Sequence, residues 1–165
     1  MEMRRKDRQA TADEAREWLK DAEYGVLSTV GPDGEPYGVP LTYAVEEGGQ
    51  SLVFHCAREG RKLACFAAHS RAHFAAVLYT RVLPEEFSIE YKSVMAAGRL
   101  EEVEGREEKI HCAQVVAAKD SDRSAEDYAT RAVDKIRVFR LRIEELSGKR
   151  LMKEGKPGMG YSSKK

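Results

Sequence analysis

Two adjacent basic residues, Arg61 and Lys62, offer the clearest chemistry in the sequence. They follow a short, apolar, β-prone segment at 51–56 and a turn at 57–60, and apolar residues then recur at helical spacing. A helix start exposes unpaired N–H donors and the positive end of the helix dipole, and basic side chains add charge-assisted hydrogen bonds. This arrangement predicts a phosphate site. The same pair also fits two solvated surface cations, and the residues alone leave both interpretations open.

His55, near the end of the same predicted strand, is the second candidate. A histidine that lines a cleft can contact a phosphate or a substrate and titrates near neutral pH. A partly buried strand histidine with one hydrogen bond is the alternative interpretation. The other histidines are scattered, and no spacing of His, Cys, Asp or Glu predicts a metal site.

Length and charge limit the possible functions. The chain has 165 residues, which suits one domain with a sizeable core, and its 28 Lys and Arg equal its 28 Asp and Glu. A zero net charge argues against a general nucleic-acid or membrane-surface role. The three cysteines lack metal-binding spacing and are interpreted as reduced thiols. Because the sequence shows neither a signal-peptide pattern nor a membrane-spanning apolar run, we expect a cytoplasmic protein.

The remaining pattern predicts mostly strands. A capping box at 11–14 begins a helix that ends near residue 22, with Trp18 as a packing anchor. Pro40 lies inside a predicted strand, so it indicates an edge, a bulge or a break. The further predicted helices cover 61–69, 105–118 and 124–133. The predicted strands cover 24–30, 36–45, 51–56, 72–79, 87–103 and 135–146.

The strand at 87–103 carries two further signals. Phe87, Ile89 and Tyr91 alternate with other residues, and we expect them to point inward. The phase blurs where four apolar residues follow one another at 94–97. A phase change of this kind predicts a bulge or a segment buried on both faces, and Gly98 permits a close backbone approach.

The strands follow one another without a βαβ rhythm. Six or seven meander strands with a few peripheral helices predict a mainly β protein, and a small split or closed antiparallel barrel is the economical architecture because closure removes exposed edges. We expect one domain over residues 1–150 and a flexible C-terminal tail at 151–165.

Several segments resemble a known family. The segments at 24–30 and 36–41 (Tyr-Gly-Val-Leu-Ser-Thr-Val and Pro-Tyr-Gly-Val-Pro-Leu) resemble the opening hairpin of the pyridoxamine 5′-phosphate oxidase-related split-barrel flavoproteins. The segments at 54–57 and 60–63 are similar to that family's phosphate segment. Those at 83–87, 91–94 and 98–99 resemble its nitroimidazole-resistance (5-nitroimidazole reductase-like) branch. The resemblance covers roughly residues 3–150 and implies a split-barrel homodimer with FMN in two interface clefts.

The resemblance also implies roles for individual residues. Arg61 and Lys62 match the basic pair that holds the FMN phosphate. His55 and Cys56 match the strand end beside the phosphate and the ribityl chain, and a histidine in this region can meet the substrate side of the flavin. His55 is therefore the candidate catalytic residue, as hydrogen-bond or proton donor to the acceptor.

Other matching positions lie near the flavin ring. Val39, Pro40 and Leu41 match the strand whose backbone faces the ring. Ser93 matches a polar position near the ring that the second subunit contributes in many members. The oxidases' C-terminal segment for pyridoxal phosphate substrates has no match here, so pyridoxamine phosphate oxidation is not expected.

These observations predict an FMN-dependent oxidoreductase that reduces small electron-poor, nitroaromatic-like molecules. The absence of a Gly-rich dinucleotide fingerprint favours FMN over FAD. We expect a nicotinamide donor or a partner reductase to be the source of electrons. The alternative is a flavin carrier or sensor without turnover, or a haem-binding protein on the same barrel with His55 as an axial ligand.

Overall fold

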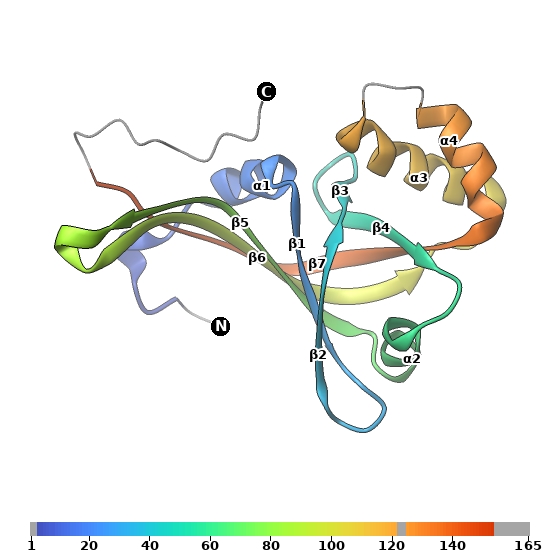
Figure 1. Cartoon of the computed structure of the whole chain (residues 1–165), viewed down its shortest axis with the longest axis horizontal. Coiled ribbons are helices and arrows are strands. Elements are labelled where there is room, and N and C mark those ends of the chain that lie inside the picture. Colours follow the sequence, from blue (N-terminus) through green and yellow to red (C-terminus); the bar gives the residue numbers. More distant parts are fainter. Residues whose placement is uncertain (1–2, 122–124, 154–165) are drawn as a thin grey trace.

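The computed structural model describes residues 3–121 and 125–153. Its strands form one antiparallel sheet in the order β2-β1-β5-β6-β7-β4-β3 (Figure 1). The strands are β1 (Tyr24–Val30), β2 (Pro36–Thr42), β3 (Ala44–Val45), β4 (Ser51–Ala57), β5 (Arg71–Leu83), β6 (Ser88–Glu102) and β7 (Ile136–Leu151). The helices are α1 (Ala12–Asp21), α2 (Arg61–Ala68), α3 (Arg106–Asp120) and α4 (Ala125–Ala132), with short 3-10 turns η1 (Lys6–Arg8), η2 (Pro84–Glu86) and η3 (Val133–Lys135).

The sheet curls around one main core. Leu27 on β1, Phe54 on β4 and Phe74 on β5 are fully buried in the same cluster. Because β1 and β4 stand near opposite ends of the strand order, a shared core requires the sheet to bend back on itself. The expected mainly β fold is confirmed. Helix α3 covers the other face of β4 and α4 packs against α3 (Figure 1), and Val53 and Val138 join a second, smaller core on this face.

Helix α1 begins as predicted. The Thr11 and Glu14 side chains exchange hydrogen bonds with each other's main-chain N–H groups at 3.2 and 2.8 Å, which makes a complete capping box. Trp18 is buried, and a side chain at Gly148 of β7 would approach its ring to 3.0 Å, so the helix packs closely on the sheet. Over the part of the chain that the structure describes, no helix is long and apolar enough to cross a bilayer.

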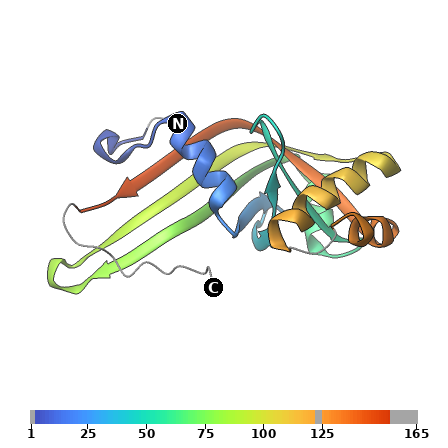
Figure 2. The same cartoon turned by 90° about the horizontal axis from the view of Figure 1, so that it is seen from above.

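Strands β5 and β6 extend beyond the main body as an arm, which Figure 2 shows in green, and β7 pairs with β6 along this arm as far as Tyr91 and Leu151. The segment at 81–83, which lies between the predicted strands at 72–79 and 87–103, is paired in this arm. Phe87 lies at the tip with φ +46° and is 99% exposed, and Ile89 is 41% exposed, so the prediction that these two residues point inward is wrong. The physical reason is that the arm's tip lies outside the core.

Gly98 marks the predicted irregularity of β6. The register between β6 and β7 shifts between Ala97 and Gly98, which is the expected bulge. A Cβ atom at Gly98 would lie 1.8 Å from the main-chain oxygen of Arg142, so only glycine fits this close approach. The expectation of burial on both faces is not met within one chain, because Val94 is fully buried whereas Met95 is 38% exposed.

The strand predicted at 36–45 breaks at Tyr43. Its first part, β2, forms one edge of the sheet and contains Pro40, whereas the short β3 lies at the opposite end of the strand order. Tyr43 is fully buried and its hydroxyl donates to the carbonyl of Leu19 at 2.5 Å. At the other end of the chain, β7 extends past the predicted 135–146 to Leu151, and residues 154–165 of the expected tail lie outside the described residues.

Candidate functional site

The predicted phosphate site forms where β4 passes into α2. Gly60 is the N-cap of α2 with φ +129° and ψ +167°, a conformation that favours glycine. Among the described side chains, none caps the first turn of this helix. The N–H of Leu63 donates to the carbonyl of Gly60 at 3.1 Å, so the N–H groups of Arg61 and Lys62 are the ones available to an external acceptor, and they lie at the positive end of the helix dipole.

Arg61 and Lys62 add two positive charges at this helix start. The guanidinium carbon of Arg61 lies 5.0 Å from the ring centre of Tyr37, on β2. Within residues 3–121 and 125–153 neither cation forms an ion pair, although nearby Arg71 and Arg137 each pair with a glutamate. These two charges therefore remain to balance a bound anion.

The open edge of β2 begins beside this helix start. Val39 and Leu41 are half-buried against the main core, whereas Pro40 between them is exposed. Pro40 lies in an edge strand, as the sequence predicted, and it has no N–H to leave unpaired. At a rise of about 3.3 Å per residue, the strand runs roughly 13 Å from Tyr37 to Leu41. An elongated ligand could therefore lie along this edge with its anionic end at α2.

His55 and Cys56 lie on opposite faces of β4. Cys56 is buried in the main core together with Phe54. Since side chains alternate along a strand, half-buried His55 lies on the other face, together with Val53. The structure therefore brings Cys56, but not the His55 side chain, to the core side of the strand.

The environment of Cys56 keeps its thiol protonated. Burial raises the pKa of Cys56, and the positive charges of Lys62 and Arg137 offset that rise only in part. A thiol that stays neutral at physiological pH is a poor nucleophile and a poor metal ligand. Cys56 therefore packs in the main core as a neutral thiol at the end of β4.

Most of this chain matches a known protein family. Residues 11–150 match the sequence model of the family described as pyridoxamine 5′-phosphate oxidase. The chain belongs to this family. Its sheet is the split barrel of that family, and the resemblance found in the sequence is confirmed. A comparison with curated proteins found no match.

Solved structures share the split-barrel fold at low sequence identity. A candidate 5-nitroimidazole antibiotic resistance protein from Bacteroides thetaiotaomicron has a TM-score of 0.71 and 20% identity, over 85% of this chain and 84% of its own. A FAD-binding protein from Mesorhizobium loti has a TM-score of 0.66 and 24% identity, over 88% and 98%. A FAD- and haem-binding protein from Mycobacterium smegmatis has a TM-score of 0.69 and 17% identity, over 92% and 76%.

Ser93 lies apart from the other predicted split-barrel site residues. It pairs with Val77 on β5 and with Lys149 on β7, whose carbonyl accepts its hydroxyl at 3.5 Å. Gly98 of β6 pairs with Ala72, which follows α2 and so marks the level of that helix on the sheet. Ser93 lies five residues before Gly98, and at about 3.3 Å per residue the two are roughly 17 Å apart along β6. Within one chain, Ser93 therefore does not join the site at α2.

Sequence reasoning missed two residues that border the site. Tyr37 positions Arg61, and Arg137 lies opposite Cys56 on β7, where it forms a paired contact with both carboxylate oxygens of Glu102. Both contacts join segments that are distant in the sequence. Alternation within each strand gives no signal of them, because the contacts depend on how α2 and β7 pack against other strands.

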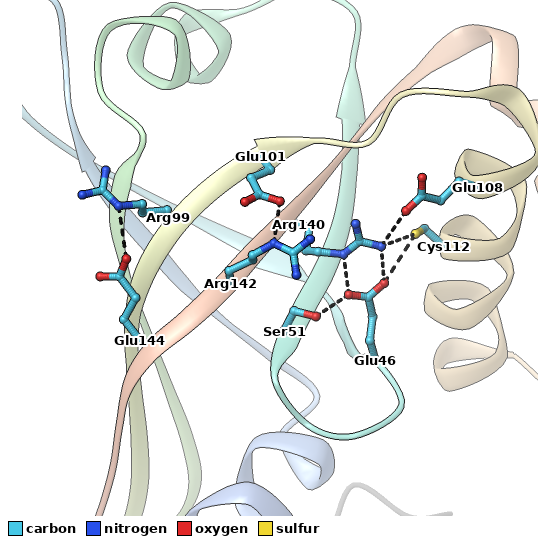
Figure 3. A network of polar contacts seen from close by, with 9 residues as sticks. All are labelled: Glu46, Ser51, Arg99, Glu101, Glu108, Cys112, Arg140, Arg142 and Glu144. Atoms are coloured by element: carbon cyan, nitrogen blue, oxygen red, sulfur yellow. Dashed lines mark hydrogen bonds and ion pairs between the residues drawn. The ribbon is translucent and has the colours of Figure 1, made fainter.

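A second polar cluster, on the α3-covered face of β7, is structural. Arg140 donates to both carboxylate oxygens of Glu46 at 2.5 and 2.6 Å and to Glu108 of α3 at 3.0 Å (Figure 3). Burial and the nearby Glu46 raise the pKa of Cys112 to about 11, so this thiol is also protonated. Among the carboxylates drawn in Figure 3, each has an arginine partner, and the cluster ties α3 to the sheet.

Proposed function

We propose that this protein binds a flavin by its phosphate and acts as an FMN-dependent oxidoreductase on small electron-poor molecules. The observation that carries the proposal is the pair Arg61 and Lys62, which lies without ion pairs to described residues at an uncapped helix start. Two structural neighbours are described as FAD-binding, and one of these also as haem-binding, which supports a flavin as the ligand.

Each residue at the site has a binding role in this proposal. Arg61 and Lys62 hold the phosphate, and Tyr37 fixes the direction of Arg61. The main chain at 39–41 lies along the ring, at the open edge of β2. A bound flavin accepts electrons at its ring, so the protein needs to supply binding and orientation but no nucleophile. FMN is the smallest flavin that carries the phosphate that this site recognises.

We further propose that two copies of the chain pair through the outer face of β5 and β6. Val77 is 60% exposed and Met95 is 38% exposed. Ser93 pairs with Val77, and Met95 lies two residues farther along the same face. Exposed apolar patches of this kind mark protein–protein contacts. A two-fold dimer would bury Ser93 in the interface and create two equivalent sites, to which the second chain contributes Ser93.

His55 is our proposed contact to the electron acceptor. Because its side chain lies on the α3 side of β4, this role requires the acceptor to reach that face. A histidine there could donate a hydrogen bond or a proton to an anion that develops on the acceptor. We propose a nicotinamide donor or a partner reductase as the source of electrons.

Anaerobic reoxidation tests turnover directly. The FMN-loaded protein is reduced, a nitroimidazole or a quinone is added, and flavin absorbance is followed. We expect the acceptor to reoxidise the flavin, and we expect His55→Ala to slow this step while FMN stays bound. His69→Ala, which changes an exposed histidine just after α2, is the matched control. Unchanged reoxidation in His55→Ala would remove His55 from the chemistry.

A carrier without turnover is the second candidate function. The neighbour described as FAD- and haem-binding favours it, because that protein shows the same fold with two cofactors. If only oxygen reoxidises the flavin in the experiment above, the carrier function replaces the enzyme. A haem titration of the flavin-free protein then tests whether His55 is an axial ligand, since His55→Ala should abolish the haem spectrum.

A further inference from the structure

A cavity lies beside the loop between β4 and α2, which contributes Arg58 to its lining. It has a volume of about 480 Å³ and lies between the start of α3, the turn η3 and the start of β7. A volume in this range is typical of small-ligand sites. Charged side chains dominate its lining, and they are Arg58, Glu102, Arg106, Lys109, Asp134 and Arg137.

The charges of this cavity do not balance. Both carboxylates are already paired, Glu102 with Arg137 and Asp134 with Arg106. Arg58 donates only to the main-chain oxygen of Asp134, at 3.1 Å. Lys109 has no ion pair within residues 3–121 and 125–153. Four basic side chains against two acidic ones leave an excess of two positive charges, which matches the charge of a phosphate monoester near pH 7.

The cavity also has an apolar wall. Val133 and Ile136 line it beside the basic residues. Val133 is buried, so a flat group would rest on half-buried Ile136 and on the guanidinium planes of the arginines while its anionic group meets the cations. A nucleotide combines these two features, because it joins a planar base to a phosphate.

The cavity adjoins the proposed flavin site. Arg58 lies in the loop between β4 and α2, three residues before Arg61, the first residue of α2. The Cys56 thiol between them feels the positive charge of both Lys62, from the flavin site, and Arg137, from the cavity. The cations of the proposed flavin site and those of the cavity therefore both lie near the end of β4.

We propose that this cavity binds the phosphate group of a nucleotide. The phosphate can belong to the adenylate half of a FAD molecule whose flavin phosphate rests on Arg61 and Lys62, or to a separate nucleotide. Only the first source depends on the proposed flavin site at Arg61 and Lys62, and it would make the bound flavin FAD in place of FMN. In both cases Arg58 and Lys109 supply the unbalanced positive charge. Replacement of these two side chains should therefore weaken binding of the nucleotide phosphate whichever molecule carries it.

The test uses the double variant Arg58→Gln/Lys109→Gln, with ADP as the probe in calorimetry and with FMN and FAD in fluorescence titrations. We expect wild-type protein to bind ADP and the double variant to bind it at least tenfold more weakly. Lys135→Gln, which removes an exposed charge of η3 outside the cavity lining, should leave binding unchanged. Thermal unfolding verifies that the double variant folds. If the double variant does not fold, the single variant Lys109→Gln is used in its place.

The flavin titrations separate the two sources. If the adenylate of FAD is the occupant, wild-type protein prefers FAD to FMN by tenfold or more, and the double variant loses this preference without losing FMN. If a separate nucleotide is the occupant, FAD and FMN bind equally and ADP binds to the FMN-loaded protein. ADP binding that depends on Arg58 and Lys109 without any flavin binding would contradict the flavin proposal alone. Two results would overturn the cavity proposal. One is that wild-type protein does not bind ADP and binds FAD and FMN equally well. The other is that the double variant binds ADP as tightly as wild type does.

Discussion

The guanidinium of Arg61 lies over the ring of Tyr37, with 5.0 Å between the guanidinium carbon and the ring centre. This contact joins α2 to the edge strand β2. It holds Arg61 in one direction without neutralising its charge, because a ring face attracts a cation but carries no net charge. The pair therefore links the two parts of the proposed site, the helix start and the open strand edge.

Replacement of Tyr37 tests this positioning role. A cation–π contact at an exposed site is worth about 0.5–1 kcal/mol, so Tyr37→Leu should weaken FMN binding by roughly two- to fivefold. Tyr37→Phe keeps the ring and should bind FMN as wild type does. Fluorescence titration of the three proteins measures the difference. A Tyr37→Phe protein as weak as Tyr37→Leu would show that the hydroxyl, not the ring, matters.

Glu90 should control acid stability. It is 1% exposed and accepts hydrogen bonds from Arg81 at 2.7 Å, from the main-chain N–H of Lys153 at 2.9 Å and from Tyr79 at 3.1 Å. The Arg81 hydrogen bond and then the Lys153 N–H lower the pKa of Glu90 from 4.5 to about 2. A lowered carboxylate pKa means that its stabilising contribution is complete above about pH 4.5 and is lost as the pH falls to about 2.

The variant Glu90→Gln checks this contribution. All three partners are donors, and an amide nitrogen cannot accept from any of them. We expect the melting temperature at pH 7 to fall by several degrees, and its further decline between pH 4.5 and 2 to be shallower than in wild type. Glu17→Gln, which changes an exposed glutamate paired with Lys20, is the control. Identical melting curves of Glu90→Gln and wild type across this range would contradict the prediction.

Charge on the outer face of β5 and β6 should separate the proposed dimer. In a two-fold interface each new lysine meets apolar surface or its own copy, so Val77→Lys and Met95→Lys should each give a monomer in sedimentation velocity. FMN affinity should fall when the dimer is lost, because Ser93 of the second chain is then missing from the site. Val30→Lys, at the end of β1, is the control for an exposed valine elsewhere. A wild-type protein that sediments as a flavin-loaded monomer would contradict the dimer.

Local signals in the sequence were sufficient for most of the fold. The capping box at Thr11 depends on residues within one turn, and the helix start at Gly60 and Arg61 depends on adjacent residues. The bulge at Gly98 was predictable because a glycine at a phase change within a strand typically marks a bulge or a close backbone approach. The presence of the strands was also predictable, because the alternation of apolar and polar residues is a property of each segment by itself.

Contacts between distant segments could not be predicted in this way. Phe87 resembles a core residue by its alternation, yet it lies at the tip of an arm that extends past the core. Tyr37 meets Arg61 only because α2 folds back onto β2, and Arg137 meets Glu102 only because β7 lies beside β6. Each of these facts follows from the packing of whole elements, which no single segment encodes.

The central claim is that Arg61 and Lys62 hold the phosphate of a flavin, and comparison of FMN with riboflavin tests it most directly. Losing one charged hydrogen bond costs about 1.5–3 kcal/mol, or roughly ten- to a hundredfold in affinity. We predict that Arg61→Ala and Lys62→Ala each weaken FMN by that factor and leave riboflavin, which lacks the phosphate, within about twofold of wild type. Lys20→Ala, on the exposed face of α1, should change neither. Equal weakening of FMN and riboflavin, or unchanged FMN binding in both variants, would contradict the account.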